Sequence, residues 1–212
     1  MIQLKSIKNA SVYSLRARIV SDVLNPLTLP LLVFGVAGWV TGQSVNNILE
    51  ILGVSALLFF VLPALSALAI SKFGGEKSFD FHSRTSRTAL YLTSILSIGL
   101  GGLIIFNEIY TNIYGLILMI YLVNLMTAFV LNFKMKVSVH VGSMVAASVL
   151  LSWLAFSNLQ TVWPSLIAVV MLGLVPLVAW SRFQLNVHSW FEILWGGIMG
   201  FTMTILMILL LA

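Results

Sequence analysis

The residues best suited to chemistry lie near the carboxyl end of the chain. His188 and Glu192 are four positions apart at the expected start of a helix, so they share one of its faces. A carboxylate that accepts a hydrogen bond from one imidazole nitrogen leaves the other nitrogen free as a nucleophile or base. Arg182 lies just before them, in an expected loop, and a guanidinium group can hold two phosphate oxygens. The pattern indicates phosphoryl chemistry, and a purely structural His–Glu hydrogen bond is the alternative.

A second cluster, residues 136–140, contains Ser138 and His140 and stands where another helix is expected to begin. Unpaired N–H groups and the positive end of the helix dipole favour an anion at such a position. Ser138 is placed to cap the helix and to donate to a phosphate, with His140 close behind it. The alternative is an ordinary helix cap followed by a buried histidine.

A third cluster, residues 77–87, lies in an expected loop and contains Lys77, Arg84 and Arg87. These cations are suited to a phosphate, but a basic loop is also the ordinary mark of the cytoplasmic side of a membrane protein. The alternative for this cluster is therefore topological charge without chemistry.

Membrane helices must position these clusters. Hydrophobic residues make up 60% of the chain and charged residues only 8%, and the mean hydropathy is +1.07. A soluble domain has about 25% charged residues. We therefore expect an all-α, polytopic transmembrane bundle of about six or seven spanning helices. The apolar segments are Val23–Gly42, Ile48–Ile70, Ala89–Phe106, Ile113–Leu131, Val141–Phe156, Trp163–Trp180 and Trp190–Leu211.

The positions of the three clusters along the chain predict that they lie on the same side of the membrane. They follow the second, fourth and sixth apolar segments, so all three emerge on one face of the membrane. Residues 23–212 are expected to form a single transmembrane domain. Residues 1–22 form a basic N-terminal segment, which is either an amphipathic helix on the membrane surface or a disordered tail. In the last segment, Gly196 and Gly200 form a small-xxx-small pair that predicts close helix packing.

Taken together, the three clusters resemble the motifs of the type 2 phosphatidic acid phosphatase superfamily. These motifs are Lys-x6-Arg-Pro, Pro-Ser-Gly-His and Ser-Arg-x5-His-x3-Asp, in that order. The sequence has Lys77-x6-Arg84-Thr85, then Val137-Ser138-Val139-His140, then Ser181-Arg182-x5-His188-x3-Glu192. The resemblance covers roughly residues 77–197. It departs from the family at Val139, at Glu192 and at Thr85, and Arg87 is a second candidate for the arginine of the first motif.

The resemblance implies an integral membrane enzyme that hydrolyses a lipid phosphate monoester or diphosphate through a phosphohistidine. His188 would be the nucleophile, Glu192 would orient it, and His140 would act as acid and then base. Lys77, Arg84 or Arg87, Ser138 and Arg182 would bind the phosphate. The candidate substrates are phosphatidate, phosphatidylglycerol phosphate and polyprenyl phosphates. A lipid phosphotransferase using the same histidines and a non-hydrolytic carrier of anionic lipids are the alternatives, and breaks near Pro63 and Pro176 would mark the carrier.

Charge and composition limit which cofactors and binding partners are expected. The six acidic residues form no cluster, so the resemblance and the composition together predict a site without metal or other cofactor. In a chain this apolar, the net charge of +5 is attributed to membrane topology and anionic lipids, and no nucleic-acid partner is expected. All eleven Lys and Arg residues lie in the N-terminal segment or in loops on the face of the clusters. This bias predicts the inner (plasma) membrane of the cell, with the site on the cytoplasmic face.

Overall fold

The computed structural model describes residues 14–74, 80–81, 83–105, 112–157 and 162–212. Within these ranges every regular element is a helix, which confirms the predicted all-α bundle. A first helix covers residues 14–23 and is called the N-terminal helix below. The others are α2 (Leu29–Val40), α3 (Val45–Ser55), the π-helix η1 (Ala56–Val61), α4 (Leu62–Gly74), α5 (Arg84–Ile105), α6 (Asn112–Asn132), α7 (Val139–Ser157), α8 (Trp163–Gln184) and α9 (Trp190–Leu211).

Five helices in the described part of the chain are both long and apolar enough to cross a membrane. They are α3 to α4 as one unit, α6, α7, α8 and α9. The helix α5 has 22 residues, the length of a span, although its first turn carries Arg84 and Arg87. These helices identify the chain as an integral membrane protein.

The first predicted segment, Val23–Gly42, is not one spanning helix. The helix α2 has only 12 residues, about 18 Å at 1.5 Å per residue, whereas a bilayer core is about 30 Å thick. Residues 24–28 form a turn in which the side chain of Asn25 accepts a hydrogen bond from the N–H of Leu27. Pro26 follows Asn25, and Pro30 stands in the first turn of α2, where its missing N–H costs nothing.

The helices continue through Pro63 and Pro176, so neither proline marks the break that a carrier would show. At Pro63 the π-helix η1 explains how the helix continues through a proline. In π geometry the N–H of Leu62 donates to the carbonyl of Leu57, five residues back. The equivalent donor to the carbonyl of Leu58 would be the N–H that Pro63 lacks. The hydroxyl of Ser97 on α5 donates to that carbonyl instead, at 2.8 Å.

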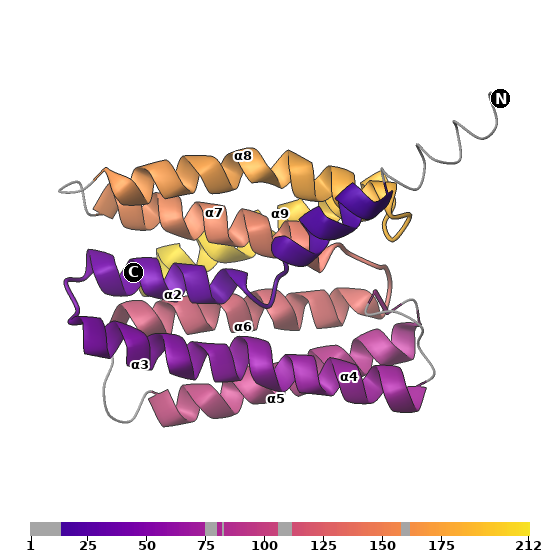
Figure 1. The fold of residues 1–212 in the computed structure, drawn as a ribbon, viewed down its shortest axis with the longest axis horizontal. Helices are drawn as coiled ribbons and strands as arrows, with labels where there is room; N and C mark the ends of the chain where they lie inside the picture. The colour runs from indigo at the N-terminus through magenta and orange to yellow at the C-terminus, as the bar shows by residue number, and fades with distance from the viewer. Residues whose placement is uncertain (1–13, 75–79, 82, 106–111, 158–161) are drawn as a thin grey trace.

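The bundle has two distinct ends (Figure 1). One end carries residues 80–81, 83, 133–138 and 185–189 together with the N-terminal helix, and it is called the site end below. The described Lys and Arg residues all belong to the helix ends and turns that meet here: Arg16, Arg18, Lys72, Arg84, Arg87, Lys134, Lys136 and Arg182. The described residues of the three clusters thus share one end with Arg16 and Arg18, although α2 is too short to span.

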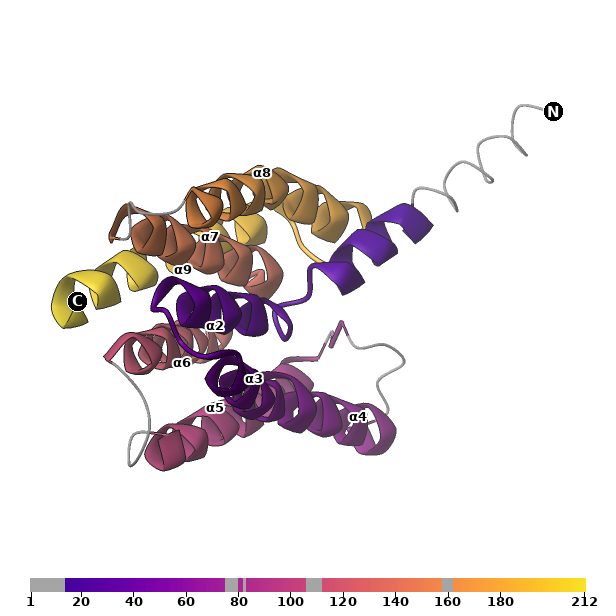
Figure 2. The ribbon, with the colours of Figure 1, turned by 60° about the vertical axis from the view of Figure 1, so that its left-hand side comes forward.

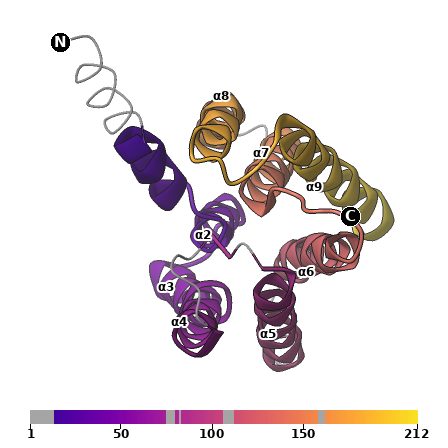
Figure 3. The same ribbon diagram turned by 90° about the vertical axis from the view of Figure 1, so that its right-hand side faces the viewer.

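The short helix α2 lies in the middle of the molecule. Seen end-on, the other helices surround it (Figure 3), and the turned view in Figure 2 agrees. Its buried face includes Val33, Phe34 and Ala37, which belong to the main apolar core. α2 therefore fills the centre of the bundle, where a polar or longer segment would disturb the packing around it.

The contact between α7 and α9 depends on glycine, as the small-xxx-small pair predicts. A Cβ atom on Gly196 would lie 2.4 Å from the carbonyl oxygen of Ser138, and one on Gly200 would lie 2.2 Å from that of Gly142. Only glycine permits the two backbones to approach so closely. The contact brings the first turns of α7 and α9 together.

Substitution of Gly200 by alanine should therefore force α7 and α9 apart. We expect Gly200→Ala to destabilise the protein by about 1–3 kcal/mol, because the added methyl group meets backbone that cannot move aside. The midpoint of thermal unfolding in detergent measures the effect. Gly197→Ala is the matched control, since its Cβ would make only ordinary contacts, the nearest being 3.7 Å from Val141. Equal midpoints for the two variants would contradict this account of the packing.

Candidate active site

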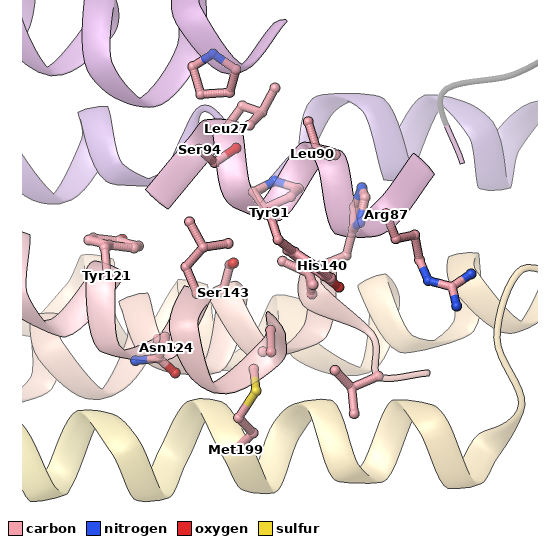
Figure 4. A pocket seen from close by; sticks show the side chains of 18 of the residues that line it. Leu27, Arg87, Leu90, Tyr91, Ser94, Tyr121, Asn124, His140, Ser143 and Met199 are labelled. Carbon is pink, nitrogen blue, oxygen red and sulfur yellow. The ribbon is translucent and has the colours of Figure 1, made fainter. Parts of the chain in front are cut away.

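A cavity of about 180 Å³ opens among the helices toward the site end. His140, His188, Arg87, Lys136 and Arg182 line it, together with the carboxylate-bearing Asp80. Figure 4 shows Arg87 and His140 toward one end of the cavity. The structure therefore gathers residues from all three predicted clusters around one space.

His188 and Glu192 interact as their spacing predicts. The Nδ1 atom of His188 lies 3.1 Å from Oε2 of Glu192, and the histidine side chain is only 7% exposed. The same carboxylate oxygen accepts a hydrogen bond from the N–H of Ser189, whose hydroxyl accepts one from the N–H of Glu192. Glu192 is thus both the partner of His188 and half of a capping box. The longer side chain of Glu192 reaches back to the N–H of Ser189. This hydrogen bond gives a physical reason for a glutamate at the position where the resembled motif has an aspartate.

Burial sets the protonation state of His188. Burial, and then the positive charges of Lys136 and Arg182, lower the pKa of His188 to about 2. The ring is therefore neutral at pH 7. A neutral ring that donates its Nδ1–H to Glu192 keeps the lone pair of Nε2, which is the form a nucleophilic histidine requires.

The turn between α8 and α9 carries His188 back toward Arg182. α8 extends to Gln184, so Arg182 lies in its last turn and not in a loop as predicted. Asn186 has a φ of +54°, a left-handed conformation that asparagine tolerates at the end of a helix. The N–H groups of Val187 and His188 then return to the carbonyl of Arg182, at 3.2 and 3.4 Å.

Two contacts fix the cluster of Ser138 and His140 beside this turn. The ammonium group of Lys136 donates to the carbonyl of Val187 at 2.6 Å, and the N–H of Ser138 donates to the carbonyl of Glu192 at 3.0 Å. Partial burial lowers the pKa of Lys136 below its usual value, while the carboxylate of Glu192 acts against this. His140, in the first turn of α7, is thereby held at the same cavity as His188.

Arg182 is buried, with 3% of its side chain exposed, and its charge is balanced. It donates to Oδ1 of Asp80 at 2.8 Å and to the hydroxyl of Ser21 at 2.6 Å. Arg18 donates to the other carboxylate oxygen of Asp80 at 2.6 Å. These bonds join the N-terminal helix, the segment before α5 and the end of α8. Although burial raises the pKa of Asp80, the hydrogen bonds and charges of Arg18 and Arg182 lower it to about 2.

The predicted phosphate ligands are placed differently from one another. Arg87 lines the cavity, with its Nε donating to Asn132 at 2.9 Å, whereas Arg84 is exposed and does not line it. Geometry thus favours Arg87 over Arg84 as the phosphate-binding arginine of the cluster at residues 77–87. Lys77 lies outside the described residues. Ser138 is fully buried, its hydroxyl has no partner among the described residues, and it does not line the cavity.

Sequence reasoning missed Asp80 and Lys136 as residues of the site. Lys136 precedes Ser138 by two positions, so its place in the second cluster was a usable signal. Asp80 lies within the cluster of residues 77–87, but nothing in the sequence indicates its partners Arg18 and Arg182, which are 62 and 102 positions away.

In the described part of the chain, no group of three or more His, Cys, Asp or Glu residues is placed to hold a metal ion. Comparisons with protein-family models, with curated proteins and with solved structures find no match to this chain.

Removal of the Asp80 charge should loosen the N-terminal helix. The pKa of about 2, against the ordinary 3.8, corresponds to about 2 kcal/mol of stability. Because the folded-state pKa is the lower one, this stability is present above about pH 4 and is lost as the pH falls toward 2. Asp80→Asn should therefore lower the unfolding midpoint at pH 7 and show a weaker acid dependence between pH 4 and 2.

Asp22→Asn is the control for Asp80, because the carboxylate of Asp22 is 63% exposed and lies 3.9 Å from the same Arg18. An exposed pair at that distance contributes little. If the two asparagine variants unfolded alike at pH 7, the Asp80 contacts would not have the stabilising role assigned to them.

Proposed function

We propose that this protein is an integral membrane phosphatase that hydrolyses a phosphate ester, or a diphosphate, on a lipid. The observation that carries the proposal is the pairing of His188 with Glu192, Nδ1 to Oε2 at 3.1 Å, beside a cavity lined by His140 and three cations. Anion binding alone does not need a histidine oriented in this way. The resemblance of the three clusters to the type 2 phosphatidic acid phosphatases supports the same reaction.

In the first step, Nε2 of His188 attacks phosphorus and the bond from phosphorus to the lipid oxygen breaks. His140, protonated while the phosphate is bound because a nearby anion favours the charged ring, donates its proton to the leaving alkoxide. Glu192 accepts the hydrogen bond from Nδ1 and stabilises the positive charge that develops on the His188 ring.

In the second step, His140 accepts a proton from a water molecule, whose oxygen attacks the phosphohistidine. The bond from phosphorus to Nε2 breaks, and phosphate leaves with His188 neutral again. Arg87, Lys136 and Arg182 would stabilise the negative charge on the phosphate oxygens in both steps, which is the main requirement of phosphoryl transfer.

The surroundings of the site support the proposal of a lipid substrate. The cavity lies among membrane helices, so a substrate can enter sideways from one leaflet. A lipid phosphotransferase would use the same first step and then pass the phosphoryl group to a second alcohol. Release of inorganic phosphate without any added acceptor separates the two reactions.

The reaction should be independent of metal ions, because the chain's own cations surround the cavity. Purified protein should release phosphate from lipid phosphates in the presence of EDTA. Orthovanadate should inhibit it by adopting the five-coordinate geometry of the transition state. Loss of activity on chelation, with recovery on adding Mg²⁺, would contradict the proposed charge stabilisation.

The capping box allows the catalytic role of Glu192 to be separated from its structural role. Glu192→Gln can still accept the hydrogen bond from Ser189 but cannot stabilise a charged His188 ring. We expect it to keep its unfolding midpoint and to lose about two to four orders of magnitude in kcat. His188→Ala should be folded and inactive.

Ser189→Ala is the matched control, because it removes the other half of the capping box and leaves the contact between His188 and Glu192 in place. It should lose about 1 kcal/mol of stability and keep most of its activity. Near wild-type rates for His188→Ala or Glu192→Gln would exclude the phosphohistidine mechanism.

We further propose that the protein lies in the inner (plasma) membrane with its site end facing the cytoplasm. The described Lys and Arg residues gather at that end, and the sequence has no Lys or Arg between α2 and α3, between α5 and α6, or between α7 and α8. Short loops rich in Lys and Arg remain inside. Because the chain has no cysteine, single cysteines report topology directly.

An impermeant maleimide applied to intact cells should label Asn46→Cys, which is exposed at the far end, and not Lys134→Cys, which is exposed at the site end. Both variants should be labelled after the membrane is permeabilised. The reverse pattern in intact cells would place the site on the outer face.

A further inference from the structure

The N-terminal helix contacts the bundle at the candidate active site. Ser21 accepts a hydrogen bond from Nη1 of Arg182 at 2.6 Å, and Arg18 donates to Asp80 at 2.6 Å. Ser21 and Arg18 are three positions apart, so both reach the site from one face of the helix. Figure 1 shows this helix at the site end, next to the last turns of α8. Because the resemblance covers only residues 77–197, it assigns these N-terminal residues no role.

These contacts hold the side chain of Arg182 from two sides. Its Nη1 donates to Ser21 and its Nη2 donates to Asp80 at 2.8 Å, while only 3% of the side chain is exposed. An arginine side chain has several rotatable bonds, and ordering them when a ligand binds costs entropy. The two hydrogen bonds order the side chain before any ligand arrives, so they preorganise the guanidinium group.

The Nε atom of Arg182 remains available to a ligand. It is buried and has no hydrogen-bond partner among the described residues, and Arg182 lines the cavity. A buried donor without a partner is costly, and a phosphate oxygen in the cavity would remove that cost. Because a guanidinium group is planar and rigid, fixing Nη1 and Nη2 also fixes the direction in which Nε–H donates.

Arg18 changes the charge that a phosphate would meet. A guanidinium group paired with a carboxylate of its own has no net charge with which to attract an anion. Because Arg18 and Arg182 bind the two oxygens of Asp80, two positive groups share one negative group. Asp22 lies 3.9 Å from Arg18, but its carboxylate is 63% exposed and is screened by solvent. A net positive charge therefore remains beside the cavity.

Neither Arg18 nor Ser21 is among the described residues that line the cavity. A ligand in the cavity therefore does not touch either side chain. Any effect that these two residues have on binding or on rate must act through Arg182 and Asp80, which do line it. This separation distinguishes a positioning role from direct contact with the substrate.

From these observations we infer that Ser21 and Arg18 are positioning residues of the active site, which act through Arg182. Ser21 and Asp80 fix the direction of the guanidinium group. Arg18 shares the charge of Asp80, so that Arg182 still attracts phosphate. The N-terminal helix is thus part of the active site as well as part of the fold. The inference rests on the proposed phosphatase activity and adds to its site two residues from outside the resembled motifs.

The first test removes the hydroxyl group that holds Nη1 of Arg182. Ser21→Ala should lower kcat/KM for a lipid phosphate by about tenfold, the range expected for one hydrogen bond to a charged group. It should raise the inhibition constant of orthovanadate by the same factor, because vanadate binds the same guanidinium group. A lower unfolding midpoint with an unchanged inhibition constant would reduce Ser21 to a structural role and overturn the inference.

Ser148→Ala is the matched control for Ser21→Ala. Both serines are 1% exposed, but the hydroxyl of Ser148 donates to the carbonyl of Met144 on its own helix, and Ser148 does not line the cavity. The control should lose stability and keep both kcat/KM and the inhibition constant of orthovanadate. An equal loss of kcat/KM in the two variants would show that burial alone, and not the contact with Arg182, sets the effect.

The second test separates the charge of Arg18 from its packing. Because the side chain is 40% exposed, its variants should fold. Arg18→Gln keeps an N–H donor and loses the charge, so it should raise the inhibition constant of orthovanadate about two- to fivefold, as expected for a charge partly screened by solvent. Arg18→Lys keeps the charge and should remain close to the unaltered protein. Equally weak inhibition in both variants would contradict the role assigned to the charge.

Arg16→Gln is the matched control for Arg18→Gln, because it removes the same charge from an exposed position on the same helix. It should leave the inhibition constant of orthovanadate unchanged. Equal effects of the two glutamine variants would mean that the overall charge of the helix matters and the contact with Asp80 does not, which would overturn the role of Arg18.

Binding of inorganic phosphate gives a readout that does not require turnover. The apparent Kd follows from the rise of the unfolding midpoint with phosphate concentration at constant ionic strength, and it should increase about tenfold in Ser21→Ala. If no lipid phosphate is hydrolysed and yet this increase is found, the phosphatase proposal fails and the positioning role stands. If lipid phosphates are hydrolysed and the Ser21 and Arg18 variants bind phosphate and vanadate like the unaltered protein, the inference fails and the proposed function stands.

Discussion

The site depends on one close approach between two helix backbones. Gly196 and Gly200 on α9 lie so near the carbonyl oxygens of Ser138 and Gly142 that a methyl group on either would overlap them. This contact places the start of α7 beside the start of α9, and the N–H of Ser138 reaches the carbonyl of Glu192. His140 and His188 belong to these two starts. Because the two backbones touch at these glycines, small rotations of either helix are resisted, and the two helix starts that carry the histidines are held together.

Buried charge is the second constraint on this end of the molecule. A guanidinium as buried as that of Arg182 requires partners, and Asp80 and Ser21 supply them. Asp80 in turn binds Arg18, which draws the N-terminal helix against the bundle. The face of this helix that carries Ala17 and Ser21 is buried, while Leu15, Ile19 and Val23 are exposed, an arrangement suited to a helix at the membrane surface.

The π-helix and the prolines near it help to give the cavity its shape. The π-helix at residues 56–61 lets one long helix continue through Pro63, and the carbonyl that the proline leaves free is satisfied by Ser97. Phe59 and Pro63, both from this region, line the cavity together with Pro26 and Pro30. The irregular backbone is thus found where the helices surround a space, as expected of membrane proteins.

The amino-acid sequence determined the helical class, the positions of most spans and the sharing of one end by the three clusters. Each of these follows from local composition and from the alternation of apolar and polar segments. It also determined the pairing of His188 with Glu192, because a spacing of four residues on a helix fixes a shared face.

Only the tertiary structure decided which cations line the cavity. Arg84 and Arg87 are alike in sequence, and the rotation of α5 within the bundle, set by packing, turns Arg87 to the cavity and leaves Arg84 exposed. The same holds for Asp80, whose partners are brought to it across 62 and 102 positions of the chain, and for α2, which packing keeps at the centre although it is too short to span. Local patterns specify local geometry, whereas contacts between distant segments depend on how all the helices pack together.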